Sequence, residues 1–445
     1  MKKLFGKKGI LRLRLRMTLL FCYAFLFLSL CLRGFGADVD PVPKLRNWLL
    51  KNRDETTGLP YSHVGDKRFE RWCITYDAAV SALAFIALGD TDEARKIIDF
   101  YSVRPEPQRL GGLIEAVHVK STASGVDWSV RSGANVWLGI ASFHLYKATG
   151  DKKYLNYSMK IADWVGELQE RDPKSPTFGG IALGPAGDPN LEGDQHIGHD
   201  PKKPAFEEIF ATEVAIDSSA LFNMLAAETG EGRFKERGKL ANQWLEKVAL
   251  NRDEHRWNRG YLKSPDKAVA TDIHAWGISM LGVDGLDHLE PGLAEKMTAF
   301  IEEHSRVTIK YKTADGKTAQ ITGFDFVDHE SAYALHRPPM VSPEWSFQMA
   351  NAYKRLADDF AMKGEKQKEE AYREKRRELV GSVMGMADVQ GEILAFPYAS
   401  LPNTMIGHEN RTPSKDNFSI IGVAYAVLAL KGYEPLQPPP VNRAR

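Results

Sequence analysis

The chain has 445 residues, of which 43% are hydrophobic and 26% are charged, which is ordinary for a globular protein. Lys and Arg total 59 against 58 for Asp and Glu, a formal charge of +1. This balance gives no general electrostatic attraction to nucleic acid, so a nucleic-acid partner is not expected. The length allows two or three domains, or one large barrel-like unit.

Residues 1–37 have the composition of a secretory signal. Residues 1–16 contain seven Lys and Arg and no acid, residues 17–32 are apolar apart from one serine, and residues 34–37 are rich in small side chains. The apolar run is shorter than the roughly 20 residues that span a bilayer, and an uncleaved anchor is the alternative. We therefore expect an exported protein, periplasmic or extracellular, which meets the membrane only through this segment.

Three cysteines are present, and Cys22 and Cys31 lie within the predicted signal. Only Cys73 would remain after cleavage, so no internal disulfide is expected. Cys73 is best explained as a buried structural thiol, since nothing in the sequence supplies a base to activate it.

Six stretches share one pattern, in which a polar or acidic start is followed by an apolar, alanine-rich helix. They are residues 76–88, 134–149, 213–229, 272–281, 343–356 and 416–431. Five of them are followed by a glycine, at positions 89, 150, 230, 282 and 432, where a left-handed residue can end a helix. Helices that are apolar on nearly every side are expected to be enclosed by other helices.

Amphipathic, charged segments alternate with these helices. They are residues 92–101, 153–167, 233–248, 292–304 and 366–383, and residues 148–165 and 228–245 also resemble each other. A buried helix followed by a half-exposed one, repeated about six times, predicts an all-α fold, an (α/α)6 toroid of six helical hairpins. An open solenoid is the alternative.

Long loops interrupt the repeats at residues 104–133, 172–206, 308–342 and 386–415, and they favour a closed ring because long loops in a compact domain usually have a function. Strand is expected only in short loop pieces such as 308–311 and 320–322. No internal boundary is visible, so residues 38–433 are expected to form a single catalytic domain. Residues 434–445 are a proline-rich tail of linker-like composition.

Four acids stand in the first turn of an apolar helix, where a ring would bring them to one end of a central funnel. They are Asp77, Glu213, Asp272 and Glu344, and each closely follows a threonine or serine. The structural alternative is that Ser/Thr caps followed by acids merely complement the helix dipole. Four acids directed at one funnel favour chemistry for the set.

Other side chains near these helix starts are candidates for binding a sugar. Aromatic rings stack on the apolar faces of sugars, and Trp72, Tyr76, Trp137, Trp276 and Trp345 accompany the acids, although a buried tryptophan can equally be core. The polar candidates are Arg131, Asn135, Asp217, His274 and Asp325. Asn135 can instead be a helix cap, His274 a buried hydrogen-bonded histidine and Asp325 a turn residue.

Metal and cofactor chemistry has little support in the sequence. Two aspartates and two histidines cluster at residues 194–200, in a loop rich in glycine and proline, and a solvated turn is the better explanation. Fingerprints of serine hydrolases, zinc proteases, phosphate loops and dinucleotide sites are missing. We expect neither a metal nor a cofactor.

Five segments of the chain resemble the six-hairpin glycosidase superfamily. They are WCITYDAAVSALAFIALGD, RSGANVWLGIASFHLYKATGDKKYL, TEVAIDSSALFNMLAAETG, DIHAWGISMLG and PEWSFQMANAYKRL. The resemblance covers roughly residues 44–432 and rests on the order and spacing of the hairpins. It implies an (α/α)6 fold and a carbohydrate-active enzyme, often an inverting glycoside hydrolase with paired acids. Lyases and sugar epimerases share the fold, so the resemblance does not fix the reaction.

The leading hypothesis is hydrolysis of a poly- or oligosaccharide, with Glu344 as general acid and Glu213 or Asp77 as base. A lyase or epimerase acting on uronic acids is a second possibility, with Tyr76, His274 and Arg131 as the reactive groups. A third is a glycan-binding toroid without catalysis.

Overall fold

The computed structural model of the chain describes residues 40–120, 125–187, 203–407, 411–415 and 417–439. The predicted signal and the cluster at residues 194–200 lie outside these residues. Residues 42–445 form one compact unit. Among the described residues, no helix is long and apolar enough to cross a membrane.

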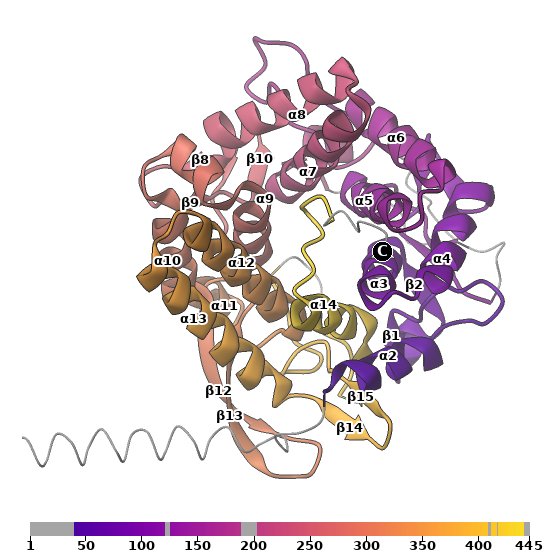
Figure 1. Ribbon diagram of the computed structural model, residues 1–445, viewed down its shortest axis with the longest axis vertical. Helices are drawn as coiled ribbons and strands as arrows, with labels where there is room; N and C mark the ends of the chain where they lie inside the picture. Colours follow the sequence, from indigo (N-terminus) through magenta and orange to yellow (C-terminus); the bar gives the residue numbers. More distant parts are fainter. Residues whose placement is uncertain (1–39, 121–124, 188–202, 408–410, 416, 440–445) are drawn as a thin grey trace, which may run out of the picture. The chain divides into compact units, whose positions relative to one another are not determined.

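Six helices form an inner ring, in which each packs against the next (Figure 1). They are α3 (Thr75–Leu88), α5 (Ser132–Thr149), α7 (Thr212–Thr229), α9 (Thr271–Leu289), α12 (Pro343–Met362) and α14 (Ile420–Lys431). The last helix, α14, contacts both α12 and α3, which closes the ring. The predicted toroid is therefore confirmed, and an open solenoid is excluded.

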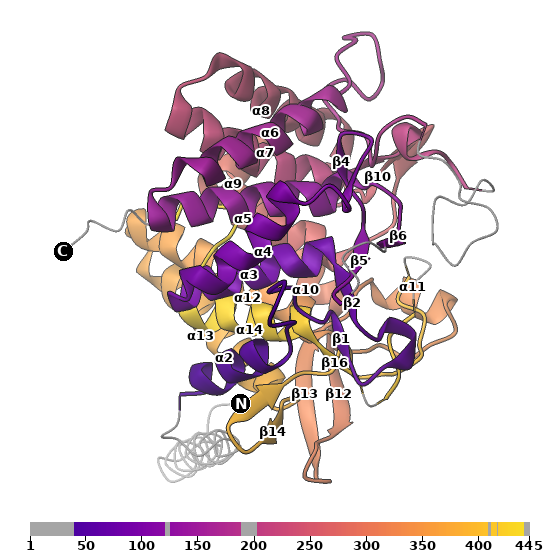
Figure 2. The same cartoon turned by 90° about the vertical axis from the view of Figure 1, so that its right-hand side faces the viewer.

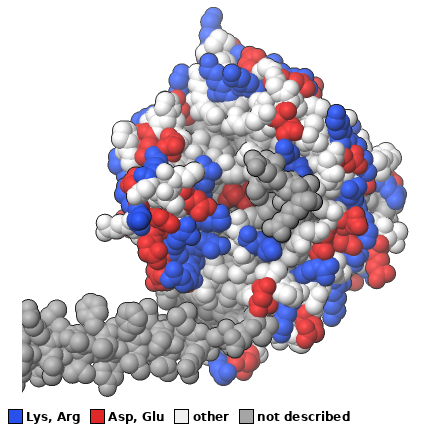
Figure 3. Space-filling model, viewed as in Figure 1, with Lys and Arg blue, Asp and Glu red and all other residues white. Residues whose placement is uncertain are grey.

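Within the described residues, six outer helices surround the inner ring. They are α2 (Val42–Lys51), α4 (Thr91–Val103), α6 (Lys152–Glu167), α8 (Gly232–Trp244), α10 (Leu293–Ser305) and α13 (Lys366–Met384). Five of them match the predicted amphipathic segments. The sixth, α2, was not predicted, and it packs against α14 from the other end of the chain. Figure 3 shows acidic and basic side chains interspersed around the outer helices, as expected for solvated faces.

The boundaries of three inner helices differ from the prediction, and one of them is α12, which runs to Met362 rather than ending at residue 356. The last inner helix begins at Ile420 rather than at residue 416, because β16 (Phe418–Ser419) pairs with β1 (His63–Val64). Gly282 was predicted to end its helix, but the helix resumes beyond it and continues to Leu289. Gly282 itself has φ 63° and ψ −170°, so it forms a kink inside α9. The other inner helices begin at or just before the predicted residue.

Strands occur as short antiparallel pieces within the loops, and most of them lie on one side of the helical ring (Figure 2). The longest pair is β12 (Arg306–Lys312) with β13 (Thr318–Phe324), which contains both predicted strand pieces. The remaining strands are β2 (Trp72–Ile74), β3 (Gln108–Arg109), β4 (Gly112–Leu113), β5 (Ala116–His118), β6 (Gly125–Asp127), β7 (Phe210–Ala211), β8 (Leu250–Asn251), β9 (Arg256–Trp257), β10 (Gly260–Leu262), β11 (Ser264–Asp266), β14 (Asp388–Gln390) and β15 (Ile393–Ala395). A short helix, α11 (His329–Ala334), lies in the loop before α12.

A hydroxyl in the first turn of four inner helices ties each helix to the loop that leads into the next inner helix. The hydroxyls donate to backbone carbonyls, Thr75 to Ile114 at 2.7 Å, Ser132 to Ala182 at 2.7 Å, Thr212 to Asn258 at 2.6 Å and Thr271 to Asp325 at 2.6 Å. The threonines therefore do not cap their own helices as predicted. Ser342 does act as a cap, accepting from the Trp345 amide at 3.4 Å. These ties fix the helix starts, and with them the first-turn acids, relative to one another.

Replacing Thr212 with valine tests this arrangement, because valine keeps the shape of threonine and removes only the hydroxyl donor. The Asn258 carbonyl would then lose its partner in a buried setting. We expect the free energy of unfolding to fall by about 1–3 kcal/mol in chemical denaturation. The same substitution at the exposed Thr318 should change it by less than about 0.5 kcal/mol, and equal effects at both positions would refute the tie.

Residues 433–439 pack across the end of the ring that is formed by the carboxyl termini of the inner helices (Figure 1). His144 of α5 contacts the Tyr433 hydroxyl at 2.6 Å and the Pro435 carbonyl at 2.9 Å. The Gln437 amide donates to two carbonyls of α9, and Leu436 is only 2% exposed. The start of the tail is thus part of the packed unit rather than a free linker, because its apolar side chains close one end of the ring.

Candidate active site

The first turns of α3, α7, α9 and α12 bring four predicted acids to the end of the ring opposite the tail. Asp77, Asp272 and Glu344 are 5%, 6% and 5% exposed, and Glu213 is half-buried. Burial is the main reason why the pKa of Glu344 lies well above its usual value, and the charges of Asp77 and Asp272 add to it. Glu213 raises the pKa of Asp272 in the same way. The four carboxyls are therefore close enough to sense one another's charge.

Glu115 is a fifth acid at this end, and it was not among the predicted residues. It lies between β4 and β5, and burial raises its pKa to about 7. Arg131 opposes that rise, and Asp127 and Glu213 add to it. Glu115 in turn raises the pKa of Asp77. Glu344, Asp77, Glu115, Glu213 and Asp272 thus form a closed circle of electrostatic neighbours, which we call the acidic ring. The available signal was an isolated acid between apolar residues in the long loop 104–133.

Glu344 lies among neutral hydrogen-bond donors and other acids. Its Oε1 atom accepts from the Tyr76 hydroxyl at 3.1 Å and from the Gln348 amide at 3.2 Å. The Tyr76 hydroxyl also lies 2.9 Å from that of Tyr425 on α14. Neutral donors do not offset burial and the neighbouring acids, so the pKa of Glu344 stays well above its usual value. This carboxyl is therefore set to hold a proton at neutral pH.

Glu213 has two cations beside it. Burial raises its pKa, but Arg131 and Arg259 both oppose that rise. Arg131 also lies 3.6 Å from Asp127, and Arg259 pairs with Asp266 at 2.6 Å, so both guanidinium groups are held in place. The pKa of Glu213 still lies above its usual value, but the two arginines hold that rise back. No other acid of the ring has two cations that lower its pKa, so Glu213 is the one whose ionised form is most supported.

Aromatic side chains from four inner helices pack against one another next to the acidic ring. Tyr76 lies in the first turn of α3 beside Asp77, and the other three lie about one turn further along their helices. The ring centroid of Trp137 lies 5.5 Å from that of Tyr76, 5.2 Å from Trp276 and 6.4 Å from Tyr425. Trp276 follows Asp272 by four residues, so both project from one face of α9. We call Tyr76, Trp137, Trp276 and Tyr425 the aromatic floor. Tyr425 was not among the predicted residues.

Asp217 joins the two layers. It follows Glu213 by four residues on α7, and its Oδ2 atom accepts from the Trp137 indole at 2.8 Å. Burial is the largest cause of a pKa well above its usual value, and Glu213 and Asp272 raise it further. Asp217 is buried and accepts this hydrogen bond on one of its two oxygens, which favours its neutral form. The bond to the indole fixes the orientation of Trp137.

Two predicted binding residues are occupied in the framework of the loops. Asn135 accepts from the Leu113 amide at 2.9 Å and donates to the Leu113 carbonyl at 3.0 Å, and it is buried. Asp325 accepts hydrogen bonds from both terminal nitrogens of the buried Arg337, each at 2.7 Å. Both side chains have their polar atoms engaged by the protein, so we do not assign them to the site.

His274 also points away from the acidic ring. Its Nδ1 atom lies 2.7 Å from the Ala270 carbonyl, its Nε2 atom accepts from the Trp257 amide at 3.3 Å, and its ring stacks on Phe300 of the outer helix α10. Burial lowers its pKa to about 3. His274 is therefore a neutral structural histidine rather than a group of the site.

The last two predicted aromatic residues lie at the edge of the site. Trp345 packs edge-on against Phe326 at 4.8 Å, and Phe326 stacks on Tyr398 at 5.6 Å. Trp72 is half-buried on β2 and packs against Phe69 at 5.3 Å. In the part of the chain that the structure describes, no three histidine, cysteine or acidic side chains are arranged to hold a metal ion.

The sequence matches no protein-family model and no curated protein. Solved structures give clear matches. The chain is similar to a family 76 glycoside hydrolase from a bovine strain of Bacteroides thetaiotaomicron, with 12% identity and a TM-score of 0.56 over 88% of this chain and 76% of that one. It is also similar to cellobiose 2-epimerase from Bacillus thermoamylovorans, with 11% identity and a TM-score of 0.59 over 87% and 98% of the two chains. This is the fold of the six-hairpin (α/α)6 toroid enzymes.

A third similar structure is an α-1,6-mannanase of Salegentibacter in complex with α-1,6-mannotriose, an inactive variant in which two aspartates are replaced by asparagine. It has 10% identity and a TM-score of 0.55 over 89% of this chain and 98% of that one. At such identities the similarity establishes the fold alone. Hydrolases and epimerases both occur among these structures, so the reaction has to be argued from the acidic ring.

Proposed function

We propose that the chain is a carbohydrate-active enzyme that hydrolyses glycosidic bonds with two carboxyl groups of the acidic ring. One observation carries the proposal, namely that Glu344 and Glu213 belong to the same acidic ring but differ in the charges beside them. Glu344 has only acids and neutral donors around it, whereas Glu213 faces two arginines. A pair of acids whose surroundings separate their pKa values is what acid–base hydrolysis requires.

In this mechanism Glu344 is the general acid. Its raised pKa keeps the proton in place until the leaving oxygen needs it. The Tyr76 hydroxyl and the Gln348 amide both donate to Oε1, which leaves Oε2 as the oxygen that can carry the transferred proton. As the carboxylate forms, the same two donors stabilise its charge.

Glu213 is the base that takes a proton from the attacking water. Arg131 and Arg259 favour its ionised form, and both arginines are held by acids of their own loops. Asp77 and Asp272 lie beside Glu344 and are suited to hold sugar hydroxyls through their carboxyl groups. Within the aromatic floor Tyr76 is the half-buried ring and the other three are buried, so Tyr76 is the ring placed to contact the apolar side of a sugar.

A lyase or epimerase would need a base that removes a proton from carbon. Tyr76 is the hydroxyl nearest to Glu344, but burial and the neighbouring Tyr425 and Glu344 raise its pKa well above its usual value. A neutral tyrosine is a poor base at neutral pH. Among the described residues, the hydrogen-bond partners and main charge neighbours of the acidic-ring carboxyls include no histidine, which also favours hydrolysis.

Product analysis tests the reaction class. The purified chain is incubated with panels of neutral and acidic oligosaccharides, and new reducing ends, 2-epimers and ultraviolet-absorbing unsaturated uronides are measured in parallel. Hydrolysis predicts new reducing ends without absorbance or epimers. Unsaturated products would establish a lyase, and epimers would establish an epimerase. Binding without any product would favour a glycan-binding toroid.

We also propose that the enzyme is exported, on the strength of the basic and apolar segments in residues 1–37. Mass spectrometry of the protein recovered from outside the cytoplasm should find a new amino terminus near residue 38. Recovery of the full chain in the membrane fraction would instead establish an uncleaved anchor.

A further inference from the structure

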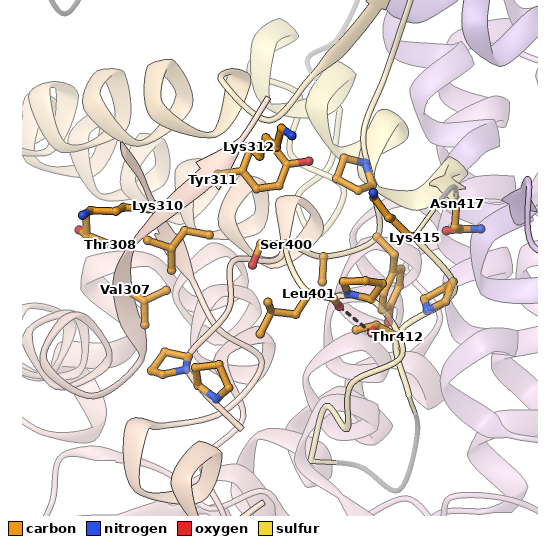
Figure 4. A pocket seen from close by; sticks show the side chains of 18 of the residues that line it. Val307, Thr308, Lys310, Tyr311, Lys312, Ser400, Leu401, Thr412, Lys415 and Asn417 are labelled. Carbon is orange, nitrogen blue, oxygen red and sulfur yellow. Dashed lines mark hydrogen bonds between the residues drawn. The ribbon is translucent and has the colours of Figure 1, made fainter. Parts of the chain in front are cut away.

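A large cavity lies beside the acidic ring, between the hairpin β12–β13 and the loops that precede α14. Its volume is about 910 Å³, and its described walls come from β12, residues 397–402, residues 412–415 and Asn417 (Figure 4). A volume of about 300–1,000 Å³ is typical of ligand sites. None of its residues was among the predicted site residues.

The charge of this cavity is opposite to that of the acidic ring. Four cationic side chains line it, Arg306, Lys310, Lys312 and Lys415, and none of the described lining residues is Asp or Glu. In Figure 4, Lys312 and Tyr311 lie on one wall and Lys415 on the facing wall. The three lysines are exposed, and Arg306 lies no closer than 4.0 Å to its acidic neighbour Glu378. The positive charge is therefore available to a ligand.

Tyr398 connects the cavity to the acidic ring. It lines the cavity, and its pKa is raised well above the usual value by burial and by the charges of Glu344, Asp77 and Asp272. Asn417 also lines the cavity and hydrogen-bonds to His63, whose ring lies 5.7 Å from that of Tyr398. Tyr398 also stacks on Phe326, which packs against Trp345 next to Glu344, so Tyr398 stands between the cavity and the acids.

We propose that this cavity, the cationic cavity, binds an acidic segment of the glycan substrate while a neutral sugar unit of the same chain occupies the acidic ring. The carboxyls of the ring offer an anionic sugar no attraction when they are protonated and repel it when they ionise, whereas the lysines of the cavity attract it. The opposed charges thus determine the direction in which a glycan with both acidic and neutral units binds, its acidic end in the cavity and its neutral unit at the acidic ring. Pro338, Pro339, Pro397 and Pro402 stiffen the walls, so little order is lost on binding.

The inference rests on the proposed function for its substrate class, but its test measures binding. Calorimetry on the full chain compares the binding of three tetrasaccharides. Two are acidic, one made of α-1,4-linked galacturonate and the other a sulfated tetrasaccharide, and the third is neutral cellotetraose. We expect an acidic tetrasaccharide to bind at least tenfold more tightly than cellotetraose at low salt, and the difference to shrink as salt rises. Binding by the galacturonate alone, or by the sulfated probe alone, identifies the anion that the cavity prefers.

The double variant Lys312→Gln with Lys415→Gln should lose at least tenfold of the affinity for the acidic probe and none for cellotetraose. Lys317→Gln is the matched control, because Lys317 lies on the same hairpin, is 82% exposed, pairs with Asp315 and does not line the cavity. Unchanged affinity in the double variant, or equal affinity for all three probes, would overturn the proposal. Loss of hydrolysis in Glu344→Gln would not affect this result, so the two proposals can fail separately.

Discussion

Replacing Glu344 with glutamine should lower kcat by about 10²–10⁴-fold while leaving the fold and the affinity for the substrate largely intact. Glutamine keeps the shape of the side chain and can still receive the hydrogen bonds of Tyr76 and Gln348. It has no proton to give to the leaving oxygen. The loss should therefore fall on kcat rather than on KM, as measured with a glycan that the wild-type chain cleaves.

The competing explanation for Glu344 is that it merely complements the dipole of α12. In that case the substitution costs about 0.3–1 kcal/mol of stability and spares the rate. Glu295→Gln is a matched control, since Glu295 stands in the first turn of the outer helix α10 and pairs with Lys368 at 2.7 Å. It should leave kcat unchanged. Turnover like that of the wild type in Glu344→Gln would remove this residue from the mechanism and make Glu213 the next acid to test.

The ring and its first-turn acids could be predicted because local signals specify them. Apolar helices that end at glycine, alternating with amphipathic ones, leave few ways to bury both kinds of helix. Once the ring closes, residues such as Asp77 and Glu344 must meet at one end. The outer helix α2 was missed because residues 42–51 are separated in sequence from α14, against which they pack.

Side-chain direction explains the predictions that the structure does not support. His274 follows Asp272 by two residues, which on a helix of 3.6 residues per turn is about 200° of rotation. When Asp272 faces the funnel, His274 must therefore face the outer helix, and it stacks on Phe300 at 6.0 Å. Asp325 and Glu115 lie in loops, where no such rule applies. Whether Asp325 meets Arg337, or Glu115 meets Asp77, depends on how the whole loop folds.

Replacing Asp77 with asparagine should make the protein more stable at neutral pH and have much less effect near pH 4. Burial is the largest cause of a folded-state pKa of about 7, against 3.8 for the unfolded chain. Between these values the folded state keeps the proton and the unfolded state releases it, so the stability of the wild type falls as pH rises from about 4 to 7. Asparagine cannot ionise, and the variant should gain up to about 4 kcal/mol above pH 7.

Denaturation of both proteins between pH 4 and pH 8 measures this difference. Asp92→Asn is the matched control, because Asp92 stands in the first turn of the outer helix α4 with its side chain 93% exposed. It should change stability by less than about 0.5 kcal/mol. A gain for Asp77→Asn that does not vary with pH would mean that the folded protein does not hold this proton.

The same substitution should also change the pH dependence of hydrolysis. Asp77 is the neighbouring charge that contributes most to the raised pKa of Glu344. Without that charge, Glu344 ionises at a lower pH, and the alkaline limb of the rate profile should move toward neutral pH. A variant that is more stable and yet loses activity at lower pH is what a buried acid kept for catalysis predicts. If the alkaline limb stays in place, Asp77 and Glu344 do not act together.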